Sequence, residues 1–265
     1  MKAVILAAWL WTRTLPITKT IPKELLPVGD KPIIQYTIEW LVAAWIDDIV
    51  IISSQQKKAL EDYFDKNYEL EDVLQKQGKL DLLALINAPK HMARYTFVKQ
   101  FEPLGTWHAV QQVCHLISDE YFMVILADTI YPPETFVDMK KAFDAKKSPL
   151  LAIHEVPRQE VYKYGIVWLD GTLVTDFVEK PKVEDAPSNS IWNGVAILPK
   201  RIFELLENIG PSATTWELYL TDAVKMLLQE TSVHSLAMRP FLDTGSIQWW
   251  LEANEKFLRK GKLFD

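Results

Sequence analysis

Short apolar runs alternate with amphipathic segments along the first half of the chain. Residues 3–8 are continuously apolar, as a strand buried on both faces of a parallel sheet must be. A polar loop with several prolines follows, and Pro32 then begins an amphipathic helix that we expect to end near residue 44. The pattern predicts further strands at 48–53, 95–99 and 121–127, with helical segments at about 56–86 and 105–116. Such alternation is typical of a parallel sheet with right-handed crossover connections.

Strands follow one another more closely in the second half of the chain. Apolar runs predict strands at 150–156, 165–169, 174–178, 195–198 and 233–239, and helices at about 217–230 and 246–260. The sequence has no repeat, low-complexity tract or long linker. We therefore expect a single α/β domain with a Rossmann-like, mostly parallel mixed sheet flanked by helices. Its halves, at about 1–130 and 131–230, share that sheet, and a C-terminal strand and helix occupy 231–265.

Composition and charge exclude several classes of protein. The 265 residues are 49% hydrophobic and 24% charged, as in ordinary globular proteins, and the net charge of −6 offers no basic surface to nucleic acid. The apolar N-terminal run is too short to cross a membrane, so we expect no membrane partner. Cys114 is the only cysteine, which excludes an intramolecular disulfide and favours a buried structural thiol and a cytoplasmic location. The five histidines show no spacing typical of a zinc site.

Three polar features fall at the edge where the parallel strands end, which is where open α/β sheets bind ligands. Arg13 and Lys23 lie in the loop after the first strand, Asp128 ends the fourth strand, and Glu179 and Lys180 follow a later strand. An aspartate at a strand end is either a Mg²⁺ ligand or the cap of the next turn, and the residue alone does not separate the two. The Glu-Lys pair, taken alone, is more typical of a solvated surface than of a binding site.

The stretch Asp243-Thr244-Gly245-Ser246 resembles the signature of aspartic proteases. Those enzymes need two such carboxylates sharing one site in an all-β fold, whereas this chain has one copy in an α/β pattern. We therefore interpret Asp243 as a metal-binding residue at the mouth of a site, with a helix N-cap just before Ser246 as the structural alternative. The sequence has no Gly-rich dinucleotide motif, Walker loop or Gly-x-Ser-x-Gly elbow, which disfavours dehydrogenases, P-loop enzymes and α/β-hydrolases.

Several short motifs are weak one by one but highly specific in combination and order. They cover nearly the whole chain and are 2–8 (KAVILAA), Thr12-Arg13 with Pro16, 22–27 (PKELLP), 30–36 (DKPIIQY), 64–74 (FDKNYELEDVL), Tyr164-Gly165, 179–182 (EKPK), 186–189 (APSN) and 220–223 (LTDA). With these motifs the sequence resembles the sugar-1-phosphate nucleotidyltransferases, and among them the bacterial UTP–glucose-1-phosphate uridylyltransferases. Residues 64–74 favour this branch over the shorter thymidylyltransferases, which use dTTP and remain the alternative.

The resemblance implies a reaction that needs no protein nucleophile. An oxygen of glucose-1-phosphate attacks the α-phosphorus of UTP in line, and pyrophosphate leaves. Because a phosphate monoester has a second pKa of about 6, the attacking oxygen is already ionised near neutral pH. Catalysis then rests on positioning and on charge neutralisation, with Mg²⁺ as the implied cofactor. We expect a homodimer or homotetramer, with the apolar C-terminal helix that carries Trp249, Trp250 and Phe257 as a candidate subunit contact.

The same resemblance assigns roles to individual residues. On the nucleotide side, Ala7, Ala8 and Trp9 belong to the phosphate loop, and Arg13 contacts the triphosphate. Lys23 neutralises charge at the α-phosphate, and Asp128 and Asp243 hold Mg²⁺. Gln100 and the Gly105 backbone read the uracil. On the sugar side, Lys180 holds the sugar phosphate, and Glu179 with the backbones of Gly165 and Gly194 holds the glucose hydroxyls. Arg13, Lys23 and Lys180 are thus the expected catalytic residues.

Tryptophan stands at positions where the family pattern has glycine. The first loop is Ala-Ala-Gly-x-Gly-Thr-Arg in the family and has Trp9 and Trp11 here, and the other positions are Trp45, Trp107, Trp216 and Trp249. The chain accordingly has ten tryptophans and only nine glycines. Glycine lets a backbone approach a phosphate and tolerates positive φ, so its loss matters most in a phosphate loop.

These substitutions lead to an expectation and to two alternatives. An indole at 9 or 11 would compete with the triphosphate for space, and Trp107 would close the base pocket, so we expect a severe loss of UTP affinity. Alternatively, the indoles point away from the ligand and stack on the rim of the base site. A further alternative is a catalytically impaired member of the fold that acts as a binding or assembly protein. Trp45 would mainly disturb a helix end, where glycine normally adopts the left-handed conformation.

Overall fold

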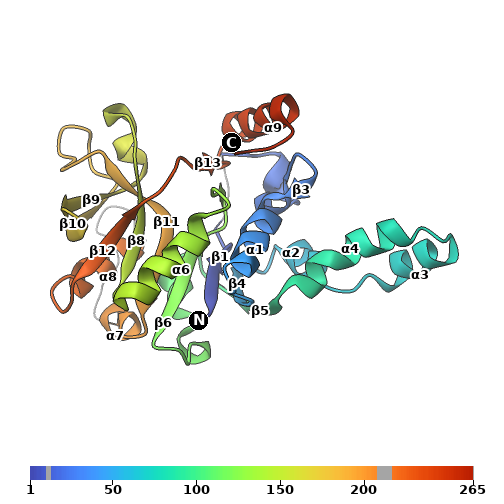
Figure 1. The fold of residues 1–265 in the computed structure, drawn as a ribbon, viewed down its shortest axis with the longest axis horizontal. Coiled ribbons are helices and arrows are strands. Elements are labelled where there is room, and N and C mark those ends of the chain that lie inside the picture. Colours follow the sequence, from blue (N-terminus) through green and yellow to red (C-terminus); the bar gives the residue numbers. More distant parts are fainter. Residues whose placement is uncertain (10–12, 208–216, 265) are drawn as a thin grey trace.

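A nine-stranded sheet forms the centre of the protein, in a computed structural model that describes residues 1–9, 13–207 and 217–264. The strand order is β5-β4-β1-β6-β11-β8-β12-β10-β9 (Figure 1). The first four are parallel to one another: β5 (Arg94–Lys99), β4 (Asp48–Ser53), β1 (Ala3–Leu6) and β6 (Tyr121–Leu126). The others are β11 (Ser190–Pro199), β8 (Leu150–Glu155), β12 (Val233–Ala237), β10 (Leu173–Glu179) and β9 (Gly165–Asp170), where only the β8–β12 neighbours are parallel.

The central strands separate two apolar layers, because successive side chains of a strand point to opposite faces. Val4 and Leu6 of β1 pack in the layer under α5 (Thr106–Gln111), α7 (Ile202–Leu206) and α8 (Leu220–Leu227). Ala3 and Ile5 pack in the opposite layer, under α1 (Ile33–Ala43) and α6 (Thr135–Lys146), which lie side by side (Figure 1). Burial on both faces explains the continuous apolar sequence of β1 and supports the expected α/β fold, in which helices cover both faces of one sheet.

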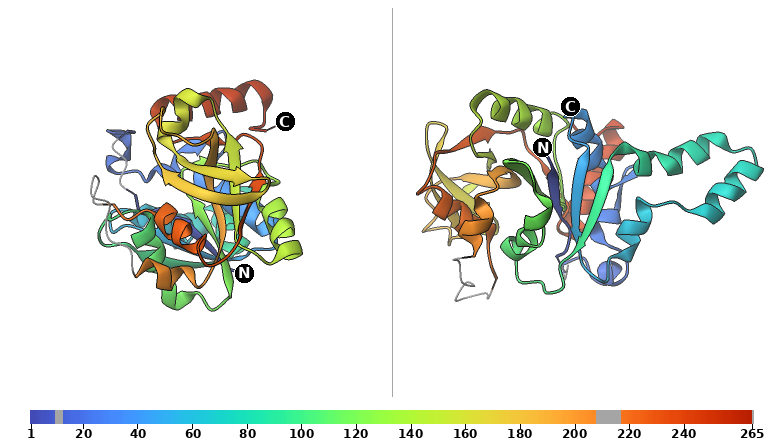
Figure 2. Two further views of the ribbon diagram at one scale, coloured as in Figure 1. Left: turned by 90° about the vertical axis from the view of Figure 1, so that its left-hand side faces the viewer. Right: turned by 90° about the horizontal axis from the view of Figure 1, so that it is seen from below.

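The remaining elements are short strand pairs, further helices and 3₁₀ turns. They are the antiparallel pairs β2 (Pro27–Val28) with β3 (Lys31–Pro32) and β7 (Thr129–Ile130) with β13 (Leu242–Asp243), the helices α2 (Lys58–Tyr63), α3 (Tyr68–Lys76), α4 (Leu80–Met92) and α9 (Ile247–Lys260), and the 3₁₀ turns η1 (Ile17–Lys19), η2 (Lys23–Leu25), η3 (Cys114–Leu116) and η4 (Arg158–Lys163). Helices α3 and α4 project from the body as a hairpin (Figures 1 and 2). In the part of the chain that the structure describes, no helix is long and apolar enough to cross a membrane.

Helix α9 is held to its own chain by the aromatic residues that the sequence suggests for a subunit contact. The indole Nε1 of Trp250 donates to the carbonyl of Pro27 at 2.8 Å. The ring of Phe257 lies against Gly29, where a Cβ would come within 2.6 Å of it. The Trp249 ring lies 5.0 Å from the ammonium of Lys163. These three rings therefore already make contacts within their own subunit.

The structure differs from the sequence-based expectations in several elements. The pattern does not predict α6, although Phe136, Met139 and Phe143 recur there at helical spacing and are buried. Strand β11 begins at Ser190 rather than at 195, because Asn193 and Gly194 interrupt its apolar pattern, and its pairing with β8 is irregular between Trp192 and Ala196. The expected burial of Cys114 is wrong: α5 ends at Gln111, and the thiol is exposed in η3.

Trp45 follows α1 in the left-handed conformation, with φ of 61°, and its side chain is 93% exposed. The expectation that glycine suits this helix end is thereby confirmed. We expect Trp45→Gly to raise the free energy of unfolding by about 1 kcal/mol, because a non-glycine residue is strained at this φ. Urea denaturation measures it, with Lys147→Gly, at φ of 50° after α6, as a matched second site. A fall in stability would contradict the expectation.

Candidate active site

A cavity of about 570 Å³ opens at the carboxyl ends of β1 and β6 and extends to β9 and β10. It is lined by residues from both halves of the sheet, which the fold brings together from positions far apart in the sequence. Of the residues predicted to form the site, the lining includes Ala8, Trp9, Arg13, Lys23, Gln100, Gly105, Asp128, Gly165, Glu179, Lys180 and Asp243. Most of the predicted site residues thus lie together at the edge of the sheet where the parallel strands end.

Two predicted contact residues do not line this cavity. The backbone of Ala7 is used within the fold, since its amide donates to the Ile52 carbonyl at 2.8 Å and its carbonyl accepts from Lys57 Nζ at 2.6 Å. Gly194 has φ of 96°, and a Cβ there would lie 2.8 Å from a methyl carbon of Leu126. The glycine therefore serves close packing within the sheet, while the adjacent Asn193 faces the cavity.

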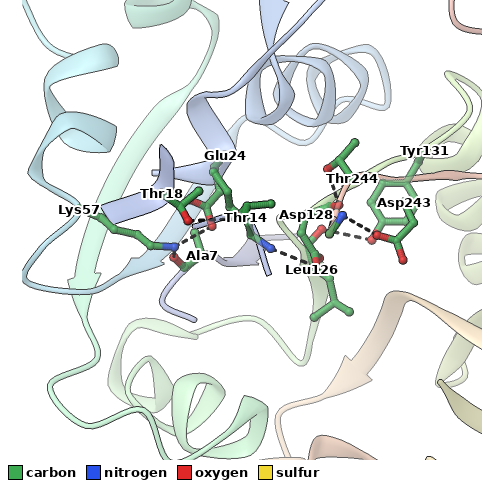
Figure 3. A network of polar contacts seen from close by, with 12 residues as sticks. Ala7, Thr14, Thr18, Glu24, Lys57, Leu126, Asp128, Tyr131, Asp243 and Thr244 are labelled. Atoms are coloured by element: carbon green, nitrogen blue, oxygen red, sulfur yellow. Dashed lines mark hydrogen bonds and ion pairs between the residues drawn. The ribbon is translucent and has the colours of Figure 1, made fainter. Parts of the chain in front are cut away.

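Asp128 and Asp243 are brought together by the short β7–β13 pair, in which Asp243 lies opposite Thr129. The hydroxyl and amide of Thr244 donate to the Asp128 carbonyl at 2.7 and 3.2 Å, which fixes the two strands (Figure 3). Burial, followed by the negative charge of Asp128, raises the pKa of Asp243 to about 6. The Ser246 hydroxyl accepts a hydrogen bond from the Trp249 amide and so caps α9. Within the stretch 243–246, Asp243 therefore lies in the cavity while Ser246 is the helix cap.

Lys23 supplies a buried cation to this carboxylate pair. Its side chain is 4% exposed, and its Nζ lies 3.0 Å from Asp128 Oδ2. Burial lowers the pKa of Lys23 to about 8, against the opposing effect of the Asp128 carboxylate. In a pocket of low dielectric constant, the carboxylates of Asp128 and Asp243 favour the binding of a cation, and the ammonium of Lys23 favours the binding of a phosphate.

The two carboxylates also fit a hard divalent cation. Burial and then the charge of Asp128 raise the pKa of Asp243, and a bound cation would offset both effects. Among the described residues no group of three or more His, Cys, Asp or Glu side chains could hold a metal. A pair is sufficient for Mg²⁺, because this ion keeps several waters and is completed by substrate phosphates.

A second buried ion pair, between Lys57 and Glu24, lies beneath the phosphate loop, and the sequence does not indicate it. Lys57 Nζ lies 2.8 Å from Glu24 Oε1 and also donates to the Ala7 carbonyl (Figure 3). Glu24 is fully buried, and its other oxygen has no hydrogen-bond partner. Lys57 thereby joins the end of β1 to the turn that carries Lys23. The only hint in the sequence is that Glu24 directly follows Lys23.

The lining of the cavity from β10 and the residue after it includes Glu179 and Lys180. Lys180 Nζ lies 3.3 Å from Glu179 Oε1, and both residues line the cavity, although the Lys180 side chain is 48% exposed and keeps contact with solvent. Burial raises the pKa of Glu179 despite the neighbouring ammonium. Lys180 Nζ also lies 5.2 Å from the centre of the Tyr219 ring, a contact that the sequence does not predict. A cation and a carboxylate side by side are suited to a phosphate and to sugar hydroxyls.

Gln100 and Gly105 form the end of the cavity next to β5 and α5. The buried Gln100 amide donates to the Gly105 carbonyl at 3.2 Å, and its nitrogen lies 3.0 Å from His108 Nδ1. Gly105 has φ of 107°, and a Cβ there would lie 2.5 Å from the Leu218 carbonyl oxygen. Backbone hydrogen bonds of 2.8 Å (Leu218 to Leu104) and 2.9 Å (Trp107 to Leu218) join this loop to the segment before α8.

The tryptophans differ in their relation to the cavity. Trp9 lines it and is 38% exposed, whereas Trp107 does not line it and is buried in the apolar layer under α5 and α8. The prediction that Trp107 closes the base pocket is therefore wrong, because its position on α5 directs the indole into the core. Its indole nitrogen is buried there without a hydrogen-bond partner. Trp11 and Trp216 lie outside the described residues.

A family model described as "Nucleotidyl transferase" matches residues 2–260. The chain belongs to the nucleotidyl transferase family. Nucleotidyl transferases of this family generally use a divalent metal ion, in keeping with the Asp128–Asp243 pair.

Relatives with known names and solved structures show which members of the family this chain is similar to. A Bacillus subtilis UTP–glucose-1-phosphate uridylyltransferase is 40% identical over 233 residues, which cover 85% of this chain and 80% of that protein. A UDP-glucose pyrophosphorylase solved with UDP-glucose has a TM-score of 0.87 at 34% identity and covers 98% of both chains. A UTP-bound enzyme of the same kind from Acinetobacter baumannii has a TM-score of 0.88 at 34% identity, covering 99% of this chain and 95% of that one.

Proposed function

We propose that this nucleotidyl transferase joins UTP and glucose-1-phosphate to give UDP-glucose and pyrophosphate. The observation that carries the proposal is the arrangement of charges in one cavity. Lys23, the Asp128–Asp243 pair, Glu179 and Lys180 all line it. Two phosphate compounds with a metal ion between them need this distribution of charge. Similarity to relatives named for UTP and UDP-glucose selects the substrates.

In this proposal the side chains position the reactants and offset their charge. Lys180 holds the phosphate of the sugar, whose oxygen attacks the α-phosphorus of UTP in line with the departing pyrophosphate. Lys23 and Arg13 stabilise negative charge on the triphosphate. The Glu179 carboxylate accepts hydrogen bonds from the glucose hydroxyls, and the Gly165 backbone provides a further contact to them. No protein group removes a proton, because the attacking phosphate is already ionised.

We propose Mg²⁺ as the divalent ion, held by Asp128 and Asp243. When bound, it supplies charge neutralisation and orientation for the phosphates. Residues 1–130 then provide the nucleotide-binding half and 131–230 the sugar-phosphate half. We further propose a cytoplasmic location, since one exposed thiol and no second cysteine suit a reducing compartment.

The proposal is tested by incubating the purified protein with UTP, glucose-1-phosphate and Mg²⁺ and measuring pyrophosphate. We expect release with UTP and at least about 10-fold slower release with dTTP, because Gln100 and Gly105 form a closely packed base end. A preference for dTTP would instead assign the chain to the thymidylyltransferase alternative. Absence of turnover with either nucleotide would leave the non-catalytic alternative.

Trp9 provides a prediction about the strength of nucleotide binding. Because its indole lines the cavity beside the phosphate loop, we expect Trp9→Gly to lower the Kd for UTP by about 10-fold, or roughly 1.4 kcal/mol. Trp107→Gly is the contrasting variant: it should leave the Kd near its original value and lower stability by about 3–5 kcal/mol, because it empties a buried site. Calorimetric titration with UTP and urea denaturation measure the two effects. An unchanged Kd in Trp9→Gly would show that the indole points away from the nucleotide.

A further inference from the structure

Asn193 has a buried side-chain donor that the fold leaves without a partner. The residue is 3% exposed and lies in β11, where that strand contributes to the lining of the cavity. Its Nδ2 atom is buried and makes no hydrogen bond within the part of the chain that the structure describes. Such a donor is unfavourable, because it has given up its hydrogen bonds to water without replacing them. We therefore look for its partner among the molecules that enter the cavity.

The backbone of the same strand decides the orientation of the Asn193 amide. The Oδ1 atom accepts a hydrogen bond from the Val195 amide at 3.2 Å. Because a backbone N–H group can only donate, the oxygen and not the nitrogen must face it. Exchanging the two atoms would place two donors against each other. The nitrogen is thus the atom that remains for a ligand, and the ligand must offer an acceptor.

The irregular part of β11 positions this side chain. The pairing with β8 is interrupted between Trp192 and Ala196, while Val195 still pairs with Ile125 of β6. Side chains bind both backbone groups of Val195 there, since the Trp192 indole donates to its carbonyl at 2.8 Å and Asn193 accepts from its amide. Irregularities of this kind re-aim side chains beside active sites. Here the neighbours Trp192 and Asn193 both line the cavity, although side chains alternate between the two faces of a regular strand.

The surroundings of Asn193 are those assigned to the sugar. Ile191, two residues earlier in β11, lies opposite Ile166 of β9. The residue before Ile166 is Gly165, which lies opposite Glu179 of β10. A carboxylate such as that of Glu179 only accepts hydrogen bonds, so a hydroxyl that donates to it keeps its own lone pairs for another donor. An uncharged amide donor beside a carboxylate therefore suits a hydroxyl-rich ligand.

We propose that Asn193 Nδ2 donates a hydrogen bond to one hydroxyl of the bound hexose, and that Asn193 thereby contributes to the choice of sugar. This role rests on the proposed function, because it needs a sugar phosphate in the cavity. A site with a buried donor rejects a ligand that lacks the matching acceptor, since the donor then stays unpaired. A sugar without that hydroxyl should therefore bind more weakly, and this penalty should disappear when Nδ2 is removed.

Titration calorimetry with a series of deoxy sugars tests the contact. The ligands are UDP-glucose and analogues that each lack one hydroxyl of the glucose, and the variant is Asn193→Leu, which removes Nδ2 with little change in size. In the unmodified chain we expect at least about 10-fold weaker binding of the analogue that lacks the partner of Nδ2. In Asn193→Leu the penalty for that analogue should fall below about threefold, while the penalties for the other analogues persist. Equal penalties in both chains overturn the proposal.

A second variant separates the lost donor from a disturbed strand. Asn193→Asp keeps an oxygen for the Val195 amide and removes the donor. We expect it to bind UDP-glucose at least about 10-fold more weakly than the unmodified chain, and to lose the penalty for the same analogue. The matched control is Asn67→Asp at the start of α3, where Asn67 Oδ1 likewise accepts from a backbone amide, that of Leu70, at 3.1 Å. This control should bind all the ligands as the unmodified chain does, and circular dichroism checks the folding of each variant.

Pyrophosphate release from UTP and glucose-1-phosphate is measured on the same chains, so that the reaction and the contact can fail separately. Binding of UDP-glucose without turnover contradicts the proposed reaction, and the deoxy series still decides the role of Asn193. Turnover with equal deoxy penalties in the unmodified and variant chains contradicts the contact alone. An unmodified chain that does not bind UDP-glucose overturns both.

Discussion

Replacing Lys57 with methionine is expected to lower the free energy of unfolding by about 3–5 kcal/mol, because it leaves the fully buried Glu24 carboxylate without its cation. It should also lower kcat for UDP-glucose formation, since Lys57 holds the Ala7 carbonyl and the turn that carries Lys23. Urea denaturation and steady-state kinetics measure the two effects. The matched control is Lys58→Met, the neighbouring exposed lysine, for which both quantities should stay near their original values.

A double variant separates positioning from stability. Lys57→Met with Glu24→Met removes both charges, and such apolar replacement of a buried pair is often close to neutral for stability. We expect stability to recover by most of the lost amount while kcat remains at least about 10-fold low and KM for UTP changes less. Full recovery of kcat together with stability would show that the pair has a purely structural role.

Lys23→Met is expected to have the largest effect on catalysis. It removes the only cation within 3.0 Å of Asp128 that the described residues provide, in the cavity where negative charge of the triphosphate would gather. We expect kcat/KM to fall by about 10²–10³-fold, as for other preorganised groups that stabilise a charged transition state. Lys19→Met, an exposed lysine of the same loop, is the control. A loss of less than about threefold in Lys23→Met would contradict the assigned role.

Much of the fold can be predicted from the sequence where local pattern and tertiary environment agree. Strand β1 is apolar throughout because it is buried on both faces, and Pro32 marks the beginning of α1. Helix α6 has a sequence that is half polar, and its few buried residues are easily overlooked. The first half of β11 is hidden by polar residues and by Gly194, where the strand is irregular.

The site is predictable where single residues end strands, and less so where distant side chains meet. Asp128 follows a strand visible in the sequence, and it lines the cavity as expected. The Lys57–Glu24 pair spans 33 residues and has no periodic signal, so only the folded chain reveals it. Trp107 shows a second limit: its neighbours Gly105 and Thr106 line the cavity, but the direction of its own side chain depends on the rotation of α5.

The backbone hydrogen bonds at Leu218 have a consequence for how the two ends of the cavity behave. They tie the loop that contains Gly105 to the segment that carries Tyr219, and Tyr219 lies against Lys180. The end of the cavity assigned to the base and the end assigned to the sugar phosphate are thus connected through the segment that contains Leu218 and Tyr219. A change in the width of the cavity at one end must move the other, so substitutions at Leu218 should alter the fit of both substrates together.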